Sequence, residues 1–232
     1  MARKDKKNIF HLQKRSLISL TNPQSPITEQ FRVVRTSIQF SSVDTDIRSV
    51  VITSPNPGEG KSTVAANLAI VFAQQGKRIL LIDSDLRKPT VHYTFRIENL
   101  IGLSNILTRQ SSLEKAVKTT RQENLWVLTS GPIPPNPAEL LSSSNMSALL
   151  EQVKNEYDFV IFDSPPVLNV TDAQILSNST DGVILVISSG KTQKDSGKKA
   201  KELLENAKAK ILGVVLNNKE VQDNQYYYYG HK

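Results

Sequence analysis

The sequence of 232 residues predicts one α/β domain, with a mainly parallel β-sheet and helices on both of its faces. Three observations predict this fold. Short apolar runs recur along the chain without polar alternation, which is typical of strands buried on both faces. Helical stretches separate these runs, as they do where crossover helices join parallel strands. The hydrophobic share of 38% is enough for a single sizeable core.

The apolar runs predict strands over residues 49–54, 78–83, 125–129, 159–163, 183–187 and 211–216. An alanine-rich helix is expected over 62–75, directly after the first strand, and Gly76 is its expected stop. Parallel sheets bind ligands at the carboxyl ends of their strands. We therefore expect the functional side chains to follow these runs.

A further helix is predicted over residues 26–40, before the first strand. Its apolar residues recur at helical spacing and are Ile27, Phe31, Val34 and Ile38. Its charged residues fall on another side of the helix and are Glu29, Arg32 and Arg35.

Composition excludes several classes of protein. The chain has no cysteine, which excludes a disulfide framework and thiolate metal sites, and its three histidines lack zinc spacing. No apolar run approaches the roughly 18 to 20 residues that span a bilayer, and the N-terminus lacks the hydrophobic core of a signal peptide. We expect a cytoplasmic protein.

The chain has a net charge of +7, which comes partly from six basic residues in the N-terminal arm, residues 1–22. Such an arm suits an anionic membrane face, nucleic acid or a partner's tail, or it is simply solvated. The sequence contains no recognition element for nucleic acid, so nucleic-acid binding is not expected. Residues 23–218 are the predicted domain, and 219–232 form a predicted flexible tail.

A phosphate-binding loop is predicted directly after the first strand, in the stretch SPNPGEGKST over residues 54–63. Backbone N–H groups at the start of a helix bind phosphate, Lys61 adds a positive charge, and the Ser62 hydroxyl suits Mg²⁺. The usual pattern has a glycine where this chain has Pro55. The candidate nucleotide-binding residues, for ATP, are Gly58, Glu59, Gly60, Lys61, Ser62 and Thr63.

Carboxylates follow two other predicted strands. Asp163 follows the run FVIF, where it would hold Mg²⁺ directly or through water. Asp83 and Asp85 follow ILLI, and residues two apart in an extended chain point the same way. Any one of these acids alone would more often be a helix cap or a turn residue. Their gathering beside the glycine-lysine loop indicates metal binding and catalysis.

Four of the six tyrosines stand near the C-terminus, at Tyr226, Tyr227, Tyr228 and Tyr229. The segment before them, 219–225, is almost wholly polar, so the run does not look like the end of a packed element. Local composition alone leaves docking on a neighbouring subunit open.

These motifs together resemble the bacterial tyrosine kinases of the capsular and exopolysaccharide type, the BY-kinases, in their cytoplasmic kinase-only form. The resemblance rests on PGEGKST, ILLIDSDLRKP, VIFDSPP, the ExxRxxRT pattern that begins at Glu29, and the tyrosine cluster. It implies a P-loop NTPase-like fold and transfer of the ATP γ-phosphate to tyrosine.

The resemblance also implies roles for the site residues. Lys61, Ser62 and Thr63 would bind the nucleotide. Asp83 and Asp85 would serve the acceptor hydroxyl and Mg²⁺, with Lys61 as their catalytic neighbour, and Asp83 is the preferred base. Ser62, Asp83 and Asp163 are then the expected metal-site residues.

The partners implied by the resemblance are other proteins. Tyr226 to Tyr229 would be autophosphorylated between protomers of a ring-shaped homo-oligomer, with Glu29, Arg32 and Arg35 at the subunit contact. A separate transmembrane activator would recruit the chain to the inner face of the cell membrane. Protein substrates, among them enzymes of polysaccharide synthesis, and a cognate tyrosine phosphatase complete the set.

The main alternative is a partition-type P-loop ATPase, acting as a nucleotide-switched assembly protein. Such proteins resemble KGGxGKT at the loop and carry an extra lysine at the place of Asn56 in this chain. That alternative also leaves the tyrosine cluster unexplained.

Overall fold

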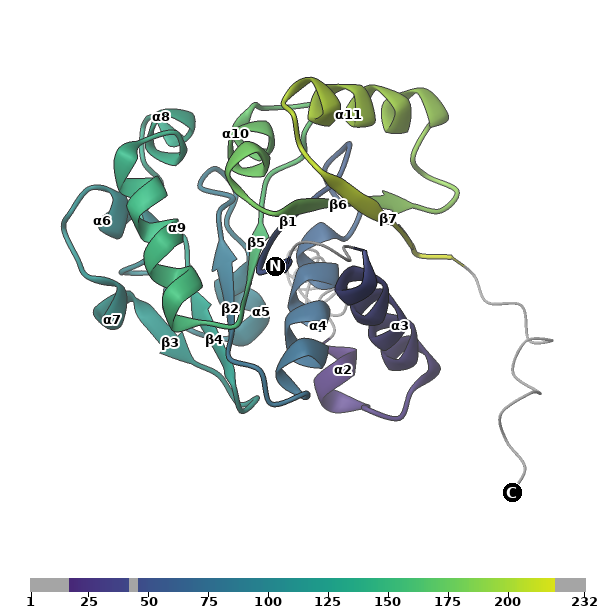
Figure 1. The fold of residues 1–232 in the computed structure, drawn as a ribbon, viewed down its shortest axis with the longest axis horizontal. Helices are drawn as coiled ribbons and strands as arrows, with labels where there is room; N and C mark the ends of the chain where they lie inside the picture. The colour runs from purple at the N-terminus through teal and green to yellow at the C-terminus, as the bar shows by residue number, and fades with distance from the viewer. Residues whose placement is uncertain (1–16, 42–45, 220–232) are drawn as a thin grey trace, which may run out of the picture.

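The computed structural model describes residues 17–41 and 46–219. Seven strands in this part of the chain form one sheet in the order β3-β4-β2-β5-β1-β6-β7 (Figure 1). Neighbouring strands are parallel except for β3 and β4. This arrangement confirms the predicted α/β fold with a mainly parallel sheet.

The strands are β1 (Ser49–Thr53), β2 (Ile79–Asp83), β3 (Val117–Thr119), β4 (Leu125–Leu128), β5 (Phe159–Asp163), β6 (Gly182–Ser188) and β7 (Ile211–Asn217). The predicted strands are all present, and their ends differ from the prediction by one residue at most. Only β3 was missed. It is short, antiparallel and partly exposed, so it lacks the apolar run by which the others were found.

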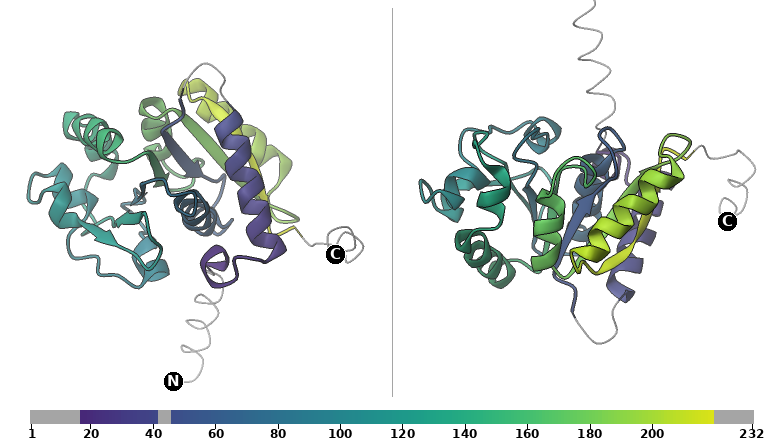
Figure 2. Two further views of the ribbon diagram at one scale, coloured as in Figure 1. Left: turned by 60° about the horizontal axis from the view of Figure 1, so that its bottom comes forward. Right: turned by 90° about the horizontal axis from the view of Figure 1, so that it is seen from above.

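The helices are α2 (Ile18–Thr21), α3 (Pro26–Phe40), α4 (Lys61–Ala73), α5 (Val91–Phe95), α6 (Leu103–Leu107), α7 (Leu113–Ala116), α8 (Pro137–Leu141), α9 (Ser144–Glu156), α10 (Asp172–Ser179) and α11 (Lys194–Asn206). Figures 1 and 2 show α3 and α4 on one side of the sheet and α9, α10 and α11 on the other. Among the described residues, no helix is both long and apolar enough to span a membrane.

Two hydrophobic cores flank the sheet, one on each face. In β2, Leu80 and Ile82 belong to the core beneath α9, while Ile79 and Leu81 belong to the core around α4. All four side chains are fully buried. Each such burial stabilises the fold by about 1.5–3 kcal/mol. Burial on both faces explains why the strands read as continuous apolar runs.

The helix α3 has the predicted bounds. Ser25 caps it by accepting a hydrogen bond from the Thr28 backbone N–H at 3.1 Å, and Pro26 occupies the first turn. One residue of the expected apolar stripe differs: Ile27 is 53% exposed, and Thr28 is buried in its place. The Thr28 hydroxyl donates to the Asn22 carbonyl, and this contact keeps the first turn's polar residue inside.

Residues 18–21, which the sequence analysis placed in the basic arm, form α2 and pack against α4. The Ser19 N–H donates to Asn67 at 2.9 Å, and Gln74 donates back to the Ser19 carbonyl at 3.0 Å. The rest of the arm up to residue 16 and the tail from residue 220 lie outside the described residues, and so do Tyr226 to Tyr229.

Candidate functional site

The predicted phosphate loop lies between β1 and α4, at the carboxyl edge of the sheet. Gly58 and Gly60 have φ values of +76° and +95°, a backbone conformation that side chains disfavour. A Cβ on Gly60 would lie 2.0 Å from the Asn217 side-chain nitrogen. Gly60 also precedes the first turn of α4, where the N–H groups of a helix are open to an anion.

Lys61 is held between two carboxylates. Its ammonium lies 3.2 Å from Asp85 Oδ2, 3.3 Å from Asp163 Oδ1 and 3.2 Å from the Ser62 hydroxyl. Burial alone would lower the pKa of Lys61, but attraction by Asp163 and Asp85 outweighs it and raises the pKa. Lys61 therefore stays charged in the interior.

Asp163 has an oxygen that the protein leaves unpaired. Its Oδ1 meets Lys61, but its Oδ2 is buried and has no hydrogen-bond partner among the described residues. Burial raises the pKa of Asp163, opposed by Lys61 and the Ser62 hydroxyl. A buried carboxylate oxygen without a partner is costly unless a cation or water satisfies it.

The oxygen atoms at this point fit Mg²⁺. The Ser62 hydroxyl and the free oxygen of Asp163 are hard ligands of the kind that Mg²⁺ prefers. Within residues 17–41 and 46–219, no group of three or more His, Cys, Asp or Glu side chains gathers as a metal cage. Sites with few protein ligands are usual for Mg²⁺ that is shared with substrate phosphates.

Asp83 and Asp163 end neighbouring strands and are paired in register. Asp83 is fully buried, and its Oδ2 accepts from the backbone N–H groups of Thr90 and Val91, both at 2.9 Å, just before α5. Burial and the nearby charge of Asp163 raise the pKa of Asp83 to about 8, against the opposing hydrogen bond from Val91.

Asp85 faces another way. Its Oδ2 meets Lys61, and its Oδ1 accepts from the Lys88 N–H at 2.9 Å. The expectation that Asp83 and Asp85 point to one side is therefore wrong in detail. The strand ends at Asp83, so the alternation of an extended chain stops before Asp85. Both acids nevertheless lie close to Lys61, whose pKa each of them raises.

The sequence analysis missed the side chains that brace the loop. Glu59 is 1% exposed, and it accepts from the Asn56 N–H at 3.1 Å and from the Thr192 hydroxyl at 2.7 Å. The Asn217 side chain donates to the Glu59 carbonyl at 2.9 Å, and Lys191 donates to the Gly58 carbonyl at 3.2 Å. The Glu59 side chain thus anchors the loop.

One of these braces could have been found from the sequence. Asn217 is the last residue of β7, at the same edge as the other strand-end residues, so the strand-end rule applies to it. Thr192 lies 133 residues from Glu59 in a loop before α11, and no local pattern connects the two.

Arg87, which the sequence left without a role, has a buried partner. Its guanidinium donates to both oxygens of Asp172, each at 3.0 Å, and the Asp172 side chain has no exposure. This hydrogen bonding with Asp172 raises the pKa of Arg87. The pair connects the loop after β2 to the first turn of α10, and so holds together two segments that border the site.

The residues predicted for a subunit contact lie on α3, away from this cluster. Arg32 pairs with Glu29 at 2.9 Å on the surface, and it also donates to the Pro23 carbonyl. Arg35 instead turns inward and donates to the Val71 carbonyl of α4 at 2.7 Å. Burial comes first among the causes that lower the pKa of Arg35, followed by repulsion from Arg32.

The glycine-cornered loop, the buried lysine and the strand-end carboxylates define an α/β P-loop protein built to bind a nucleotide. A family model described as "AAA domain" matches residues 47–211. Tyrosine-protein kinase YwqD of Bacillus subtilis is 56% identical over 228 residues, which cover 98% of this chain and 96% of YwqD. The chain belongs to the bacterial tyrosine-protein kinases, the family that its motifs predicted.

Solved structures agree with this assignment. The chimerical protein CapA2B2 aligns with a TM-score of 0.86 and 49% identity, covering 88% of this chain and 90% of that one. The cell division ATPase MinD of Pyrococcus furiosus aligns less well, with a TM-score of 0.64 and 26% identity over 76% of this chain and 74% of that one. The P-loop NTPase-like fold and the enzyme class are confirmed, and the partition-type alternative is the weaker match.

Proposed function

We propose that this kinase uses Mg·ATP to phosphorylate its own tyrosine cluster, Tyr226 to Tyr229, and tyrosines of other proteins, and that it thereby regulates exopolysaccharide or capsule synthesis. The observation that carries the proposal is the contact of Lys61 with two strand-end carboxylates beside a loop shaped for phosphate. Phosphoryl transfer asks a protein mainly to position the reactants and to balance their charge.

Nucleotide binding falls to the loop and to the first turn of α4. Backbone N–H groups from Gly58 to Lys61 would surround the phosphates. The Lys61 ammonium would then share its contacts between the carboxylates and the phosphates. We assign Ser62, Thr63, Asp83 and Asp163 to holding the nucleotide and its metal. Mg²⁺, when bound, would neutralise charge on the transferred phosphate.

The acceptor hydroxyl requires a base, because a tyrosine with its ordinary pKa near 10 is scarcely ionised at neutral pH. We assign this role to the ionised form of Asp83, which its pKa of about 8 makes a minor form at neutral pH but a stronger base than an ordinary carboxylate. The proton would pass to Asp83 while the tyrosine oxygen bonds to the γ-phosphorus and the bond from that phosphorus to ADP breaks. Asp85 would keep Lys61 oriented.

The proposed partners follow from the family. CapA2B2 is named as a chimera, and we propose that a separate transmembrane activator stabilises the nucleotide site of this chain and brings it to the membrane. We also propose a ring-shaped homo-oligomer that contacts its neighbours through α3. This helix exposes Val33 and Phe40 by 53% and 79%, which supports contact with another molecule. A tyrosine phosphatase would reverse the modification.

The test is incubation of the full chain with Mg·ATP, followed by mapping of the phosphorylated residues. We expect label on Tyr226 to Tyr229, lost by at least about a hundredfold in Lys61→Met, because a missing charge-stabilising group costs about 2.7–4 kcal/mol in such reactions. Lys77→Met, which removes an exposed lysine, is the matched control and should label normally. ATP hydrolysis without tyrosine label would instead support the partition-type alternative.

A further inference from the structure

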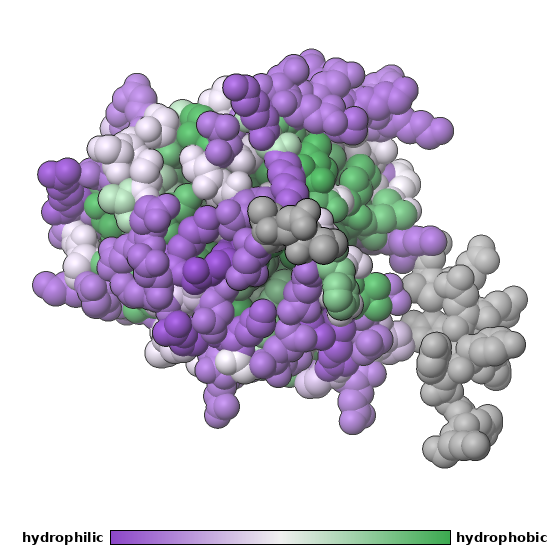
Figure 3. Space-filling view, in the orientation of Figure 1, coloured by the Kyte–Doolittle hydropathy of each residue, from purple (hydrophilic) through white to green (hydrophobic). Residues whose placement is uncertain are grey.

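An apolar groove lies between α11 and the outer strands β6 and β7, outside the nucleotide site. Its volume is about 430 Å³. One wall is apolar and contains Leu185, Ile187 and Val214, and the other side carries Lys194, Lys198 and Lys201 of α11. Figure 3 shows this surface as a hydrophobic area beneath the hydrophilic α11.

The groove is uncovered at the edge of the sheet. Val214 and Leu216 of the edge strand β7 are 57% and 53% exposed. Exposed apolar edge strands invite pairing with other chains, and proteins usually cover or charge them. Here the covering helix leaves a gap, so the surface is shaped for an occupant.

A glycine in α11 keeps this gap open. Gly197 lies in the interior of α11, where glycine is less favourable than alanine. Close packing does not require it, since an added Cβ would meet only Ile187 at an ordinary contact distance of 3.7 Å. The missing side chain therefore widens the groove at the expense of helix stability.

The rim of the groove is cationic. Lys194, Lys198 and Lys201 follow one another at the spacing of a single helix face. Lys201 pairs with Glu205 at 2.8 Å on the surface, whereas no salt bridge engages Lys194 or Lys198 within the described ranges. An apolar wall facing a lysine row matches a phosphotyrosine, which combines an aromatic ring with a dianionic group.

The chain's own C-terminal segment starts beside this groove. The Asn217 carbonyl, at the end of β7, accepts from the Ser189 N–H at 2.8 Å, in the loop that leads into α11. Six residues lie between Lys219 and Tyr226, and the seven steps from one to the other span up to roughly 25 Å when extended. The lysine row covers only about 10 Å along the helix, from a rise of 1.5 Å per residue.

We propose that this groove binds the phosphorylated tyrosine cluster of the same chain. The proposal rests on the proposed function, because it assumes that Tyr226 to Tyr229 are phosphorylated. Unmodified tyrosines gain only the apolar wall, whereas phosphorylated ones also gain the lysine row. Thr192 lines the groove and donates to Glu59 of the phosphate loop. A peptide in the groove would therefore lie next to a residue that braces the loop.

The test uses two synthetic fluorescent peptides of residues 219–232, one with phosphotyrosine at all four positions and one unmodified. Binding to the unphosphorylated full chain is measured by fluorescence anisotropy. We expect the phosphopeptide to bind at least about tenfold more tightly, since several charge contacts of a few tenths to 1 kcal/mol add up to that factor. Because the peptides are made chemically, the result does not depend on kinase activity.

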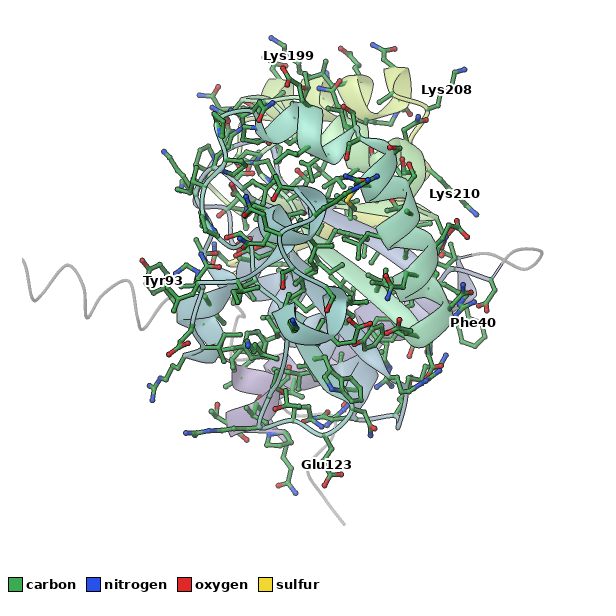
Figure 4. The ribbon with its side chains drawn as sticks, turned by 90° about the vertical axis from the view of Figure 1, so that its left-hand side faces the viewer. Phe40, Tyr93, Glu123, Lys199, Lys208 and Lys210 are labelled. Carbon is green, nitrogen blue, oxygen red and sulfur yellow. The ribbon has the colours of Figure 1, made fainter. Side chains whose placement is uncertain are left out.

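Three variants locate the binding site. Replacing Lys194, Lys198 and Lys201 by Gln should weaken phosphopeptide binding about tenfold. The control replaces Lys199, Lys208 and Lys210 by Gln, which removes the same charge. These three lysines project from the outside of the molecule in Figure 4 and do not line the groove. Gly197→Leu should fill the groove and abolish binding while the melting temperature stays equal or rises.

Several results would overturn the proposal. Equal weakening by both triple variants would mean unspecific attraction to lysines. Full binding of the phosphopeptide by Gly197→Leu would exclude the groove as its binding site. Equal binding of the unmodified peptide would mean that the phosphate groups do not contribute. Release of the phosphopeptide by saturating Mg·ATP alone would place it at the nucleotide site instead. Intact peptide binding combined with a failure to label Tyr226 to Tyr229 would leave the groove standing and refute the proposed function.

Discussion

Asp83 is buried, and no salt bridge engages it among the described residues. Its protonation therefore makes the stability of the protein depend on pH. Its folded pKa is about 8, against an ordinary value of 3.8. A pKa raised by folding means that the folded state binds the proton more tightly. The associated stability is present below the ordinary pKa and is lost as pH rises towards 8.

This titration predicts a stability difference between two proteins. From pH 6 to pH 8, the nucleotide-free wild type should lose about 2 kcal/mol more unfolding free energy than Asp83→Asn, which has no proton to lose. Urea unfolding at pH 6, 7 and 8 measures both slopes. Glu123→Gln, at an exposed position labelled in Figure 4, should retain the wild-type slope. Parallel slopes for wild type and Asp83→Asn would contradict the raised pKa.

Thr192 shows how much a single hydroxyl contributes to the shape of the loop. Thr192→Val keeps the side chain's volume but removes the 2.7 Å hydrogen bond to buried Glu59. We expect a loss of about 1 kcal/mol in stability and roughly fivefold weaker ATP binding, because the loop loses its tether to the loop before α11. Calorimetric titration with ATP checks this. Thr94→Val, whose hydroxyl donates to the carbonyl of Thr90 just before α5, serves as the control and should bind ATP normally.

Among the elements, α10 and the loop after β2 are joined by the Arg87–Asp172 pair. Replacing Arg87 by Met leaves the carboxylate of Asp172 buried and unpaired. Because Arg87 itself is 39% exposed, we expect a moderate destabilisation of about 1–3 kcal/mol rather than the full cost of breaking a buried pair. Thermal unfolding measures it. Lys88→Met, at the neighbouring exposed lysine, should change the melting temperature little, and an equal loss would mean that charge alone matters.

Strands and the long helices were predictable because their signals are local. Burial on both faces gives each central strand its apolar run, and Ser25 with Pro26 marks the start of α3. Short pieces such as β3 and α7 carry no such signal, since three or four residues are too few for a period. Their formation depends on contacts with β4 and with the core.

The main residues of the site were also predictable from local signals, but other features of the site depend on contacts that are not local. Strand ends and a glycine-lysine loop identify Lys61, Asp83 and Asp163, because a parallel sheet brings these positions to one edge. The orientation of Asp85 and the bracing of Glu59 depend on where the chain turns after the strand and on residues far along the sequence. No pattern of single residues contains that information.

For the whole molecule, the exposed side chains of α3 bear on assembly. Phe40, which Figure 4 shows pointing away from the body of the protein, is 79% exposed at the end of this helix. If α3 forms the proposed subunit contact, Phe40→Ser should shift sedimentation towards smaller species while ATP affinity stays unchanged. Leu100→Ser, a comparably exposed change at 73% elsewhere on the surface, is the control. Unaltered sedimentation of Phe40→Ser would exclude that residue from the contact.

The central position of β1 has a consequence for the protein's synthesis. The phosphate loop follows β1, but the strands that pair with β1 in the described part of the chain are β5 and β6, which are made more than a hundred residues later. The carboxylate of Asp163 and the amide of Asn217 also come from these later parts. We therefore expect the nucleotide-binding loop of a growing chain to take its shape only after β7 has been made.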